Sequence, residues 1–185
     1  MSSLLGHALA GLTVSAAFTQ GRPSRRVGAW AVACAVAPDL DWFADLLPAL
    51  RDTDLAHRGL GHSLLAAALL ATLAMGLGFR DRLRSPRLWG CMGAAAISHG
   101  LLDACTFGGT AVGFLLPFSS ARFISLWQPL FVTPIPVTGR LFEWLCFSLA
   151  TELAWIGTPA LLVFGLPRLL ARLRARRELS EEAAS

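Results

Sequence analysis

Five apolar stretches, each between 16 and 26 residues long, take up most of the sequence and restrict the folds that the chain can adopt. About 20 mostly apolar residues are enough for a helix to cross a bilayer, and a helix satisfies its own backbone hydrogen bonds in lipid. Only 15% of the residues are charged, whereas soluble domains average about 25%. The sequence therefore predicts an all-α polytopic membrane bundle of about five transmembrane or partly spanning helices. The stretches are Leu4–Thr19, Val27–Leu50, Leu64–Phe79, Leu88–Thr106 and Leu141–Leu166, of which the first and third are short.

The length of 185 residues suits a single domain. We expect residues 1–177 to form one membrane-embedded helical domain and residues 178–185 to form a polar C-terminal tail. The first apolar stretch has the hydrophobicity of a signal-peptide core, but residues 1–6 contain no Arg or Lys, and the stretch itself contains His7. We therefore interpret it as a retained first span.

The basic residues separate the two sides of the predicted membrane protein. All 16 are Arg, and 12 of them lie in three segments, 21–26, 80–87 and 168–177. The connections 51–61 and 107–140 contain two Arg each. Because Arg-rich loops stay in the cytoplasm, we expect a multi-pass protein of the bacterial inner membrane with its N-terminus and these two connections outside. The same distribution accounts for the net charge of +4, because most Arg residues lie on one side of the membrane. It indicates the lipid bilayer, and not nucleic acid, as the partner.

Seven ionisable side chains, including all four histidines, lie in or beside the outer halves of the predicted spans. Such groups are costly in a membrane and mark sites or pathways. Imidazole and carboxylate ligands together suit zinc, manganese or iron. We predict a site for divalent metal ions, zinc first, and two or more ions because seven ligands exceed the four of tetrahedral zinc. The candidate ligands are His7, Asp39, Asp41, His57, His62, His99 and Asp103.

The spacing of the acidic residues adds detail to this prediction. His99 and Asp103 are four residues apart, so a helix presents both on one face. Asp39 and Asp41 are two apart, and a regular helix would point them in different directions. Pro38 precedes them and is expected to break the helix. A broken segment can then direct both carboxylates into one polar cavity.

The connection before the third stretch brings two histidines together. His57 and His62 bracket Gly59 and Gly61, and these glycines allow a tight turn in which both imidazoles face one ion. Ser63 follows directly. We expect it to cap the third helix, because serine is favoured at helix starts.

Several motifs together resemble those of the YdjM-like family of bacterial inner-membrane proteins, which are described as membrane-bound metal-dependent hydrolases. The resemblance covers about residues 1–150. The motifs are His7, Pro38-Asp39-Leu40-Asp41-Trp42, His57-Arg58-Gly59-Leu60-Gly61-His62-Ser63, Ser98-His99-Gly100-Leu101-Leu102-Asp103, Leu116-Pro117-Phe118-Ser119 and Thr138-Gly139-Arg140-Leu141-Phe142-Glu143.

The resemblance implies a hydrolase distantly similar to zinc-dependent phospholipase C. It places the seven candidate ligands at the family's metal-ligand positions and Glu143 at a family acidic position. This chain departs from the family at Gly61, where many members have Thr, and at Leu116, where many have Trp. Neither departure removes a ligand, but both alter the expected wall of the pocket.

A metal-activated water is the nucleophile that such a site would supply. Arg58 can hold a phosphate or carboxylate oxygen through a bidentate contact, or instead lie among lipid headgroups. Glu143 begins the fifth stretch, where it can act as a ligand, a general base or a partner of the helix dipole. The position at the outer membrane–water boundary suits an amphiphilic phosphoester as substrate.

Two classes without catalysis stay open at this point. A transporter also uses intramembrane His and Asp, although such sites usually lie near the bilayer midplane between repeats. A membrane scaffold can hold a structural metal, and its coordination would be closed, whereas a catalytic ion keeps an open position.

Overall fold

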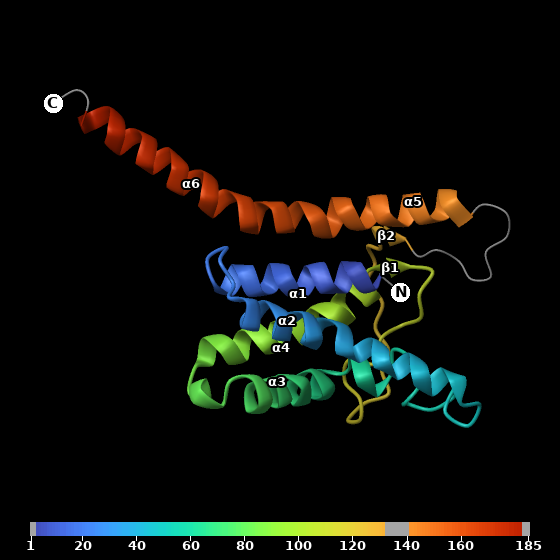
Figure 1. Cartoon of the computed structure of the whole chain (residues 1–185). Helices are drawn as coiled ribbons and strands as arrows, with labels where there is room; N and C mark the ends of the chain where they lie inside the picture. Colours follow the sequence, from blue (N-terminus) through green and yellow to red (C-terminus); the bar gives the residue numbers. More distant parts are fainter. Residues whose placement is uncertain (1–2, 132–140, 183–185) are drawn as a thin grey trace.

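The computed structural model of the chain describes residues 3–131 and 141–182 and is mostly helical (Figure 1). Four helices form a bundle, and a long helical segment lies beside α1 (Figure 1). In chain order the elements are α1 (Leu4–Phe18), α2 (Arg25–Val36), the 3-10 helices η1 (Ala37–Leu46) and η2 (Leu60–His62), α3 (Leu64–Gly78), the 3-10 turn η3 (Arg80–Arg82), α4 (Pro86–Ala104), β1 (Thr106–Phe107), β2 (Leu130–Phe131), α5 (Leu141–Glu152), the π-helical turn η4 (Leu153–Gly157) and α6 (Thr158–Glu182).

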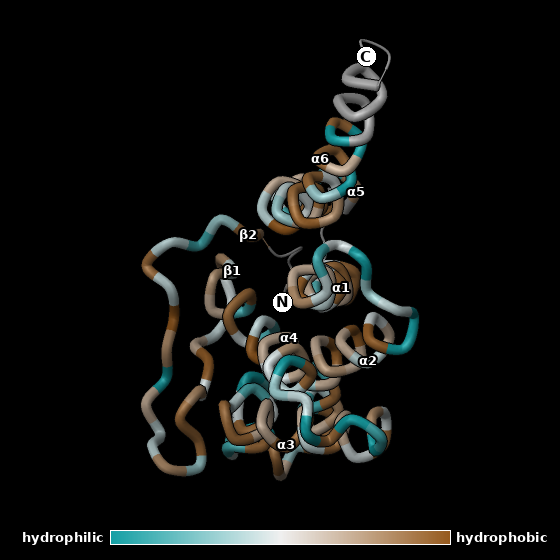
Figure 2. Tube along the Cα trace, turned by 90° about the vertical axis from the view of Figure 1, so that its left-hand side faces the viewer, coloured by the Kyte–Doolittle hydropathy of each residue, from teal (hydrophilic) through white to brown (hydrophobic). Residues whose placement is uncertain are grey.

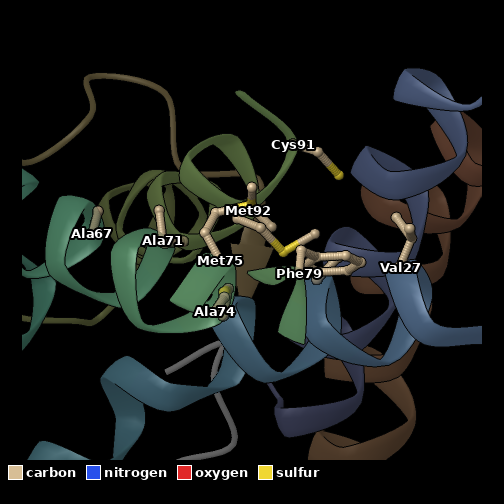
Figure 3. Packing of buried hydrophobic residues seen from close by; sticks show 12 residues of the cluster. Val27, Ala67, Ala71, Ala74, Met75, Phe79, Cys91 and Met92 are labelled. Atoms are coloured by element: carbon tan, nitrogen blue, oxygen red, sulfur yellow. The ribbon is translucent and has the colours of Figure 1, made fainter. Parts of the chain in front are cut away.

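The core of the bundle consists mainly of small side chains from α2, α3 and α4, with Met75, Met92 and Phe79 as its largest members (Figure 3). Met75 and Met92 are fully buried, and alanines such as Ala31 and Ala95 separate the helices. Unbranched methionine fills irregular gaps between backbones that approach closely. Small residues at helix contacts are typical of helices that pack within a membrane.

Most leucines of α3 point out of the bundle instead of into it. On α3 the exposed fractions are 61% for Leu69 and 55% for Leu73, whereas Ala71 and Ala74 are 4% and 1% exposed. In a water-soluble bundle the larger side chains would occupy the core. This inverted distribution agrees with a surface that contacts lipid.

All four helices of the bundle begin at a serine that caps the first turn. In each case the serine hydroxyl accepts a hydrogen bond from the backbone N–H three residues later. The cap satisfies one of the free amide groups at the helix start. The capping role predicted for Ser63 is confirmed. The other caps are Ser3, Ser24 and Ser85.

The break predicted at Pro38 is present. α2 ends at Val36, and the chain continues as the 3-10 helix η1 over the next ten residues. Proline lacks the N–H that an α-helix needs and clashes with the preceding turn. The change in geometry allows Asp39 and Asp41 to point towards different histidines of the same site.

The helical segment from α5 to α6 lies alongside α1 and extends beyond the bundle (Figure 1). Two segments of the described chain, 25–46 and 142–174, are long and apolar enough to cross a membrane, while α1 and α3 have 15 residues each. The expected count of about five spans is therefore not confirmed. α6 remains helical to Glu182, within the segment expected to be a polar tail, and 183–185 lie outside the described residues.

The mostly helical fold that the sequence predicted also contains a short pair of strands. Two short strands pair in parallel, with Thr106 opposite Leu130 and Phe107 opposite Phe131. Backbone groups that leave a helix inside a protein need new partners, and this pair supplies them on either side of the long connection. Residues 132–140 of that connection, with part of the last family motif, lie outside the described residues.

The Arg-rich connections and the candidate ligands occupy opposite ends of the bundle. Figure 1 shows the α1–α2 and α3–α4 connections together at the left-hand end, whereas η1, η2 and the end of α4 lie to the right. In Figure 2, which faces the Arg-rich end, the α1–α2 connection is hydrophilic and the helices are mostly apolar. The separation of charge predicted from the sequence is therefore a property of the fold.

The contact between α1 and α2 provides a test of the packing. A Cβ added at Gly11 would lie 2.7 Å from the carbonyl oxygen of Ala31, so one helix would have to move. We expect Gly11→Ala to destabilise the protein by about 1–3 kcal/mol through overpacking. Gly76→Ala is the matched control, because nothing lies within 4 Å of its added Cβ and alanine favours the helix. Thermal unfolding in detergent measures the difference. Equal changes in unfolding temperature for the two variants would contradict the close contact between α1 and α2.

Candidate metal centre

All seven candidate ligands lie at one end of the bundle, although they come from four separate parts of the chain. α1 contributes a histidine near its start, and η1 contributes two aspartates just after the break. The segment before α3 contributes two histidines, and α4 contributes a His–Asp pair one turn apart near its end. In chain order they are His7, Asp39, Asp41, His57, His62, His99 and Asp103.

Six of these residues form two overlapping groups. In each group, one ligand atom from every residue lies within 4.8 Å of the others. The groups share two carboxylates, one from η1 and one from α4, and each adds two histidines of its own. The first group is His7, Asp39, His99 and Asp103; the second is Asp39, His57, His62 and Asp103.

The distances between ligand atoms match the edges of a coordination shell. Nε2 of His99 lies 2.9 Å from Nε2 of His62 and 3.4 Å from Oδ1 of Asp39. The Asp103 carboxylate oxygens lie 3.3 Å from His62 Nε2 and 3.5 Å from His7 Nε2. Ligand atoms bound at 2.0–2.1 Å to a tetrahedral zinc are about 3.3–3.4 Å apart. Three of the four distances are close to this value, whereas the two histidine nitrogens lie at hydrogen-bond distance, so the donors are grouped as a divalent ion would require.

Several buried polar atoms in the two groups have no hydrogen-bond partner among the described residues. They include both ring nitrogens of His7, Nε2 of His57, Oδ1 of Asp39 and both carboxylate oxygens of Asp103. The two carboxylates make ion pairs at 3.1–3.5 Å, but buried polar atoms that lack hydrogen bonds are costly, and buried charges are normally paired or bound to metal. The same atoms are the ones that a cation in the two groups would contact.

Asp41 lies beside the two groups and orients their histidines. Its two oxygens accept from Nδ1 of His57 at 2.7 Å and from Nδ1 of His62 at 2.8 Å. Similarly, Nδ1 of His99 lies 2.7 Å from the carbonyl oxygen of Ala35. Partners at Nδ1 fix each ring and leave Nε2 for a metal. The sequence placed Asp41 among the ligands, whereas in the structure both of its oxygens face histidine Nδ1 atoms.

The carboxylates of the site favour a positive charge at His62. Burial alone would lower the pKa of His62, but the nearby carboxylates of Asp103 and Asp41 outweigh it and raise this pKa to about 9. The two carboxylates thus stabilise a positive charge at His62. A metal cation placed at the same position would gain from the same attraction.

Arg58 is buried against the candidate ligands. It is 1% exposed, and its Nε lies 3.1 Å from Oδ2 of Asp103. Its Nη1 donates to the carbonyl of Thr110, whereas Nη2 has no hydrogen-bond partner among the described residues. Nη2 is therefore the guanidinium atom left for the predicted contact with a substrate oxygen, and that contact stays a prediction.

The long connection encloses Arg58, which the sequence did not indicate. A Cβ added at Gly109 would lie 2.1 Å from Nη1 of Arg58, so only glycine leaves room for the guanidinium. Arg122 donates to the carbonyl oxygen of Arg58, whose φ of +65° is in the left-handed region. The adjacent glycines at 108 and 109 were the one sequence signal of this close approach.

The two acidic residues of α5 lie outside both groups. Glu143 is an exposed residue in the first turn of α5, and its proposed part in catalysis stays a prediction. Glu152 is buried and accepts hydrogen bonds from the backbone N–H and the hydroxyl of Ser3. This contact holds the end of α5 against the start of α1, one turn before His7, and nothing in the sequence predicted it.

An apolar cavity of about 410 Å³ borders Asp41. A Cβ added at Gly61 would lie 2.8 Å from Oδ2 of Asp41, so the side chain found in many family members would disturb this carboxylate here. The departure from the family pattern at this position thus permits the close contact between η1 and η2. The cavity is lined by Asp41, Ala44, Leu50, Leu55, Leu60, Gly61, Leu65, Ala66 and Leu69.

The fold and the site together define a helical membrane protein with a buried cluster of His and Asp residues that can hold metal. A profile of the YdjM inner membrane proteins matches residues 1–177. Inner membrane protein YbcI of Escherichia coli (strain K12) is 32% identical over 133 residues, which are 71% of this chain and 77% of that protein. The chain therefore belongs to the YdjM family of inner membrane proteins. No solved structure gives a significant match.

The orienting position of Asp41 leads to a graded expectation. Asp41→Asn removes the carboxylate charge but keeps the size of the side chain, so the histidines lose orientation and basicity while the ligand atoms remain. We expect metal affinity to fall about 10–100-fold. Competition with a metal indicator in detergent measures this, with Asp52→Asn at an exposed loop position as the control. Complete loss of metal would instead identify Asp41 as a ligand.

Proposed function

We propose that this protein crosses the bacterial inner membrane several times and carries its metal centre at the outer side. The support is the separation of the Arg-rich connections from the His and Asp residues at the two ends of the bundle. The outward-facing leucines of α3 agree with helices that contact lipid although they are short. About five helices would then span or partly span the bilayer.

The centre is proposed to bind two divalent ions, with zinc preferred for its mixed nitrogen and oxygen ligands. The observation that carries this proposal is that two four-residue groups share the carboxylates of Asp39 and Asp103. His7 and His99 would complete one position, and His57 and His62 the other. Carboxylates shared between paired ions are suited to phosphoester hydrolysis.

The proposed reaction is hydrolysis of a phosphoester in a lipid-like, amphiphilic substrate. Bound divalent ions lower the pKa of water to about 7 and so supply a nucleophile at neutral pH. Asp41 keeps the histidine rings in place. Arg58 offers Nη2, which is buried and has no partner among the described residues, to a phosphate oxygen.

The function is tested with purified protein, elemental analysis and a panel of phospholipids and phosphodiesters. We expect bound zinc and turnover of at least one substrate, with activity abolished by a chelator and restored by zinc. Activity that survives complete removal of metal would contradict the mechanism. Metal that binds stoichiometrically without turnover of any substrate would favour a non-catalytic metal-binding protein or a transporter.

A further inference from the structure

A second cavity, with a mixed basic and apolar lining, lies at the opposite end of the bundle from the candidate metal centre. Its volume is about 410 Å³, and it opens between the α1–α2 connection and the start of α4. Three arginines line it: Arg22 from the first connection, and Arg82 and Arg87 from the second connection and the first turn of α4. Because these segments are far apart in the sequence, the cavity exists only in the folded bundle.

The positive charge of this cavity is poorly compensated. Its lining contains no acidic residue, and the nearby Asp81 pairs with Arg82 at 3.5 Å and with Arg26 at 3.7 Å. No ion pair within the described part of the chain involves Arg22 or Arg87. The cavity therefore presents at least two guanidinium groups that have no acidic partner among the described residues.

The helices beside the cavity add to this charge instead of reducing it. α2 and α4 both begin here, and neither has an acidic residue in its first turn. The positive end of a helix dipole favours anions and is normally complemented by Asp or Glu. Arg25 and Arg87 occupy these first turns instead. An anion bound in the cavity would relieve the repulsion from the arginines and from the two helix ends.

The remaining wall of the cavity is apolar and distinguishes between kinds of anion. Phe18, Val27 and Leu88 line it beside the arginines. A free inorganic anion gains nothing from such a wall, whereas the glycerol and upper acyl region of a lipid does. Basic pockets between membrane helices on the cytoplasmic side bind anionic lipid headgroups.

We propose that this cavity binds the headgroup phosphate of an anionic membrane lipid, with Arg22 and Arg87 contacting the phosphate oxygens. Guanidinium groups recognise phosphate through short, charge-assisted hydrogen bonds. The lipid would tie the α1–α2 connection to the start of α4 at the proposed cytoplasmic face. This site is independent of the metal centre and of the proposed hydrolysis.

The test uses the full chain in detergent, with dioctanoyl phosphatidylglycerol as the anionic lipid and dioctanoyl phosphatidylcholine as the zwitterionic one. Native mass spectrometry and thermal unfolding report binding. We expect the double variant Arg22→Gln/Arg87→Gln to bind phosphatidylglycerol on the order of tenfold more weakly than the unmodified chain. Arg80→Gln/Arg84→Gln, which removes the same charge from outside the cavity, should retain binding.

Two further arms keep the outcome unambiguous. Arg22→Lys/Arg87→Lys keeps the charge and should bind better than the glutamine pair, while circular dichroism confirms that every variant is folded. Equal loss of binding in the cavity pair and the control pair would overturn the site. Inorganic phosphate that stabilises the protein as strongly as phosphatidylglycerol, with the same dependence on Arg22 and Arg87, would overturn its assignment to a lipid.

Discussion

Asp103→Asn is expected to empty the candidate metal centre. The affinity of the purified protein for metal should fall by more than about 100-fold. Asp103 belongs to both ligand groups, so its loss affects both positions. A neutral amide does not bridge two cations or balance their charge. Loss of a hydrogen-bond partner outside the coordination shell already lowers metal affinity about 10–100-fold, so loss of a shared ligand should lower it further. Elemental analysis and indicator competition measure the change.

A companion variant separates a shared ligand from an unshared one. His7 belongs only to the first group, so His7→Gln should lower the stoichiometry from two ions to one. Asp52→Asn, at an exposed position outside both groups, should leave metal content unchanged. If Asp103→Asn and His7→Gln lost the same number of ions in folded protein, the two groups would not share this carboxylate.

Arg58→Met is expected to lower the free energy of unfolding by about 3–5 kcal/mol in metal-depleted protein. The substitution leaves Asp103 as a buried charge without its guanidinium partner, and breaking one side of a buried pair has this effect. A bound cation compensates the same carboxylate, so the loss should be smaller in metal-loaded protein. Thermal or denaturant unfolding with and without zinc tests both statements.

Two comparisons separate the Arg58–Asp103 interaction from the effect of replacing any arginine in this connection. Arg51→Met, at an exposed position in the same connection, should change stability by no more than about 0.5 kcal/mol. The double variant Arg58→Met/Asp103→Asn should lose less stability than the two single variants added together, because neither charge is then left alone. Additive losses would show that Arg58 and Asp103 do not stabilise each other.

Local features of the chain were largely predictable because each depends on residues close in sequence. Ser63 caps α3 through an amide three residues later, and Pro38 ends α2 through its own ring. The end of the bundle that would hold metal also followed from the order of apolar and Arg-rich segments. The short β1–β2 pair was missed because it joins residues more than 20 positions apart.

The distribution of roles within the site could not be predicted in the same way. Asp39 and Asp41 look equivalent in the sequence, yet one lies in both ligand groups and the other faces two histidine Nδ1 atoms. Which of these roles a carboxylate takes depends on the direction of its oxygens at the break in the helix. For Arg58 the sequence left two positions open, a contact with a substrate oxygen and a place among lipid headgroups, and it did not predict that the long connection covers this side chain.

The sequence by itself determined the class of protein and the kind of ligand atoms at its centre. The lengths of the apolar segments and the positions of Arg, His and Asp determine how the chain interacts with water and lipid. These effects can be predicted without knowing which residues contact each other. Tertiary structure alone decided which carboxylates both groups include, which histidine nitrogens face Asp41 or a backbone carbonyl, and which arginine is buried. These depend on distances of a few ångströms between helices, and only the packing of the whole bundle sets such distances.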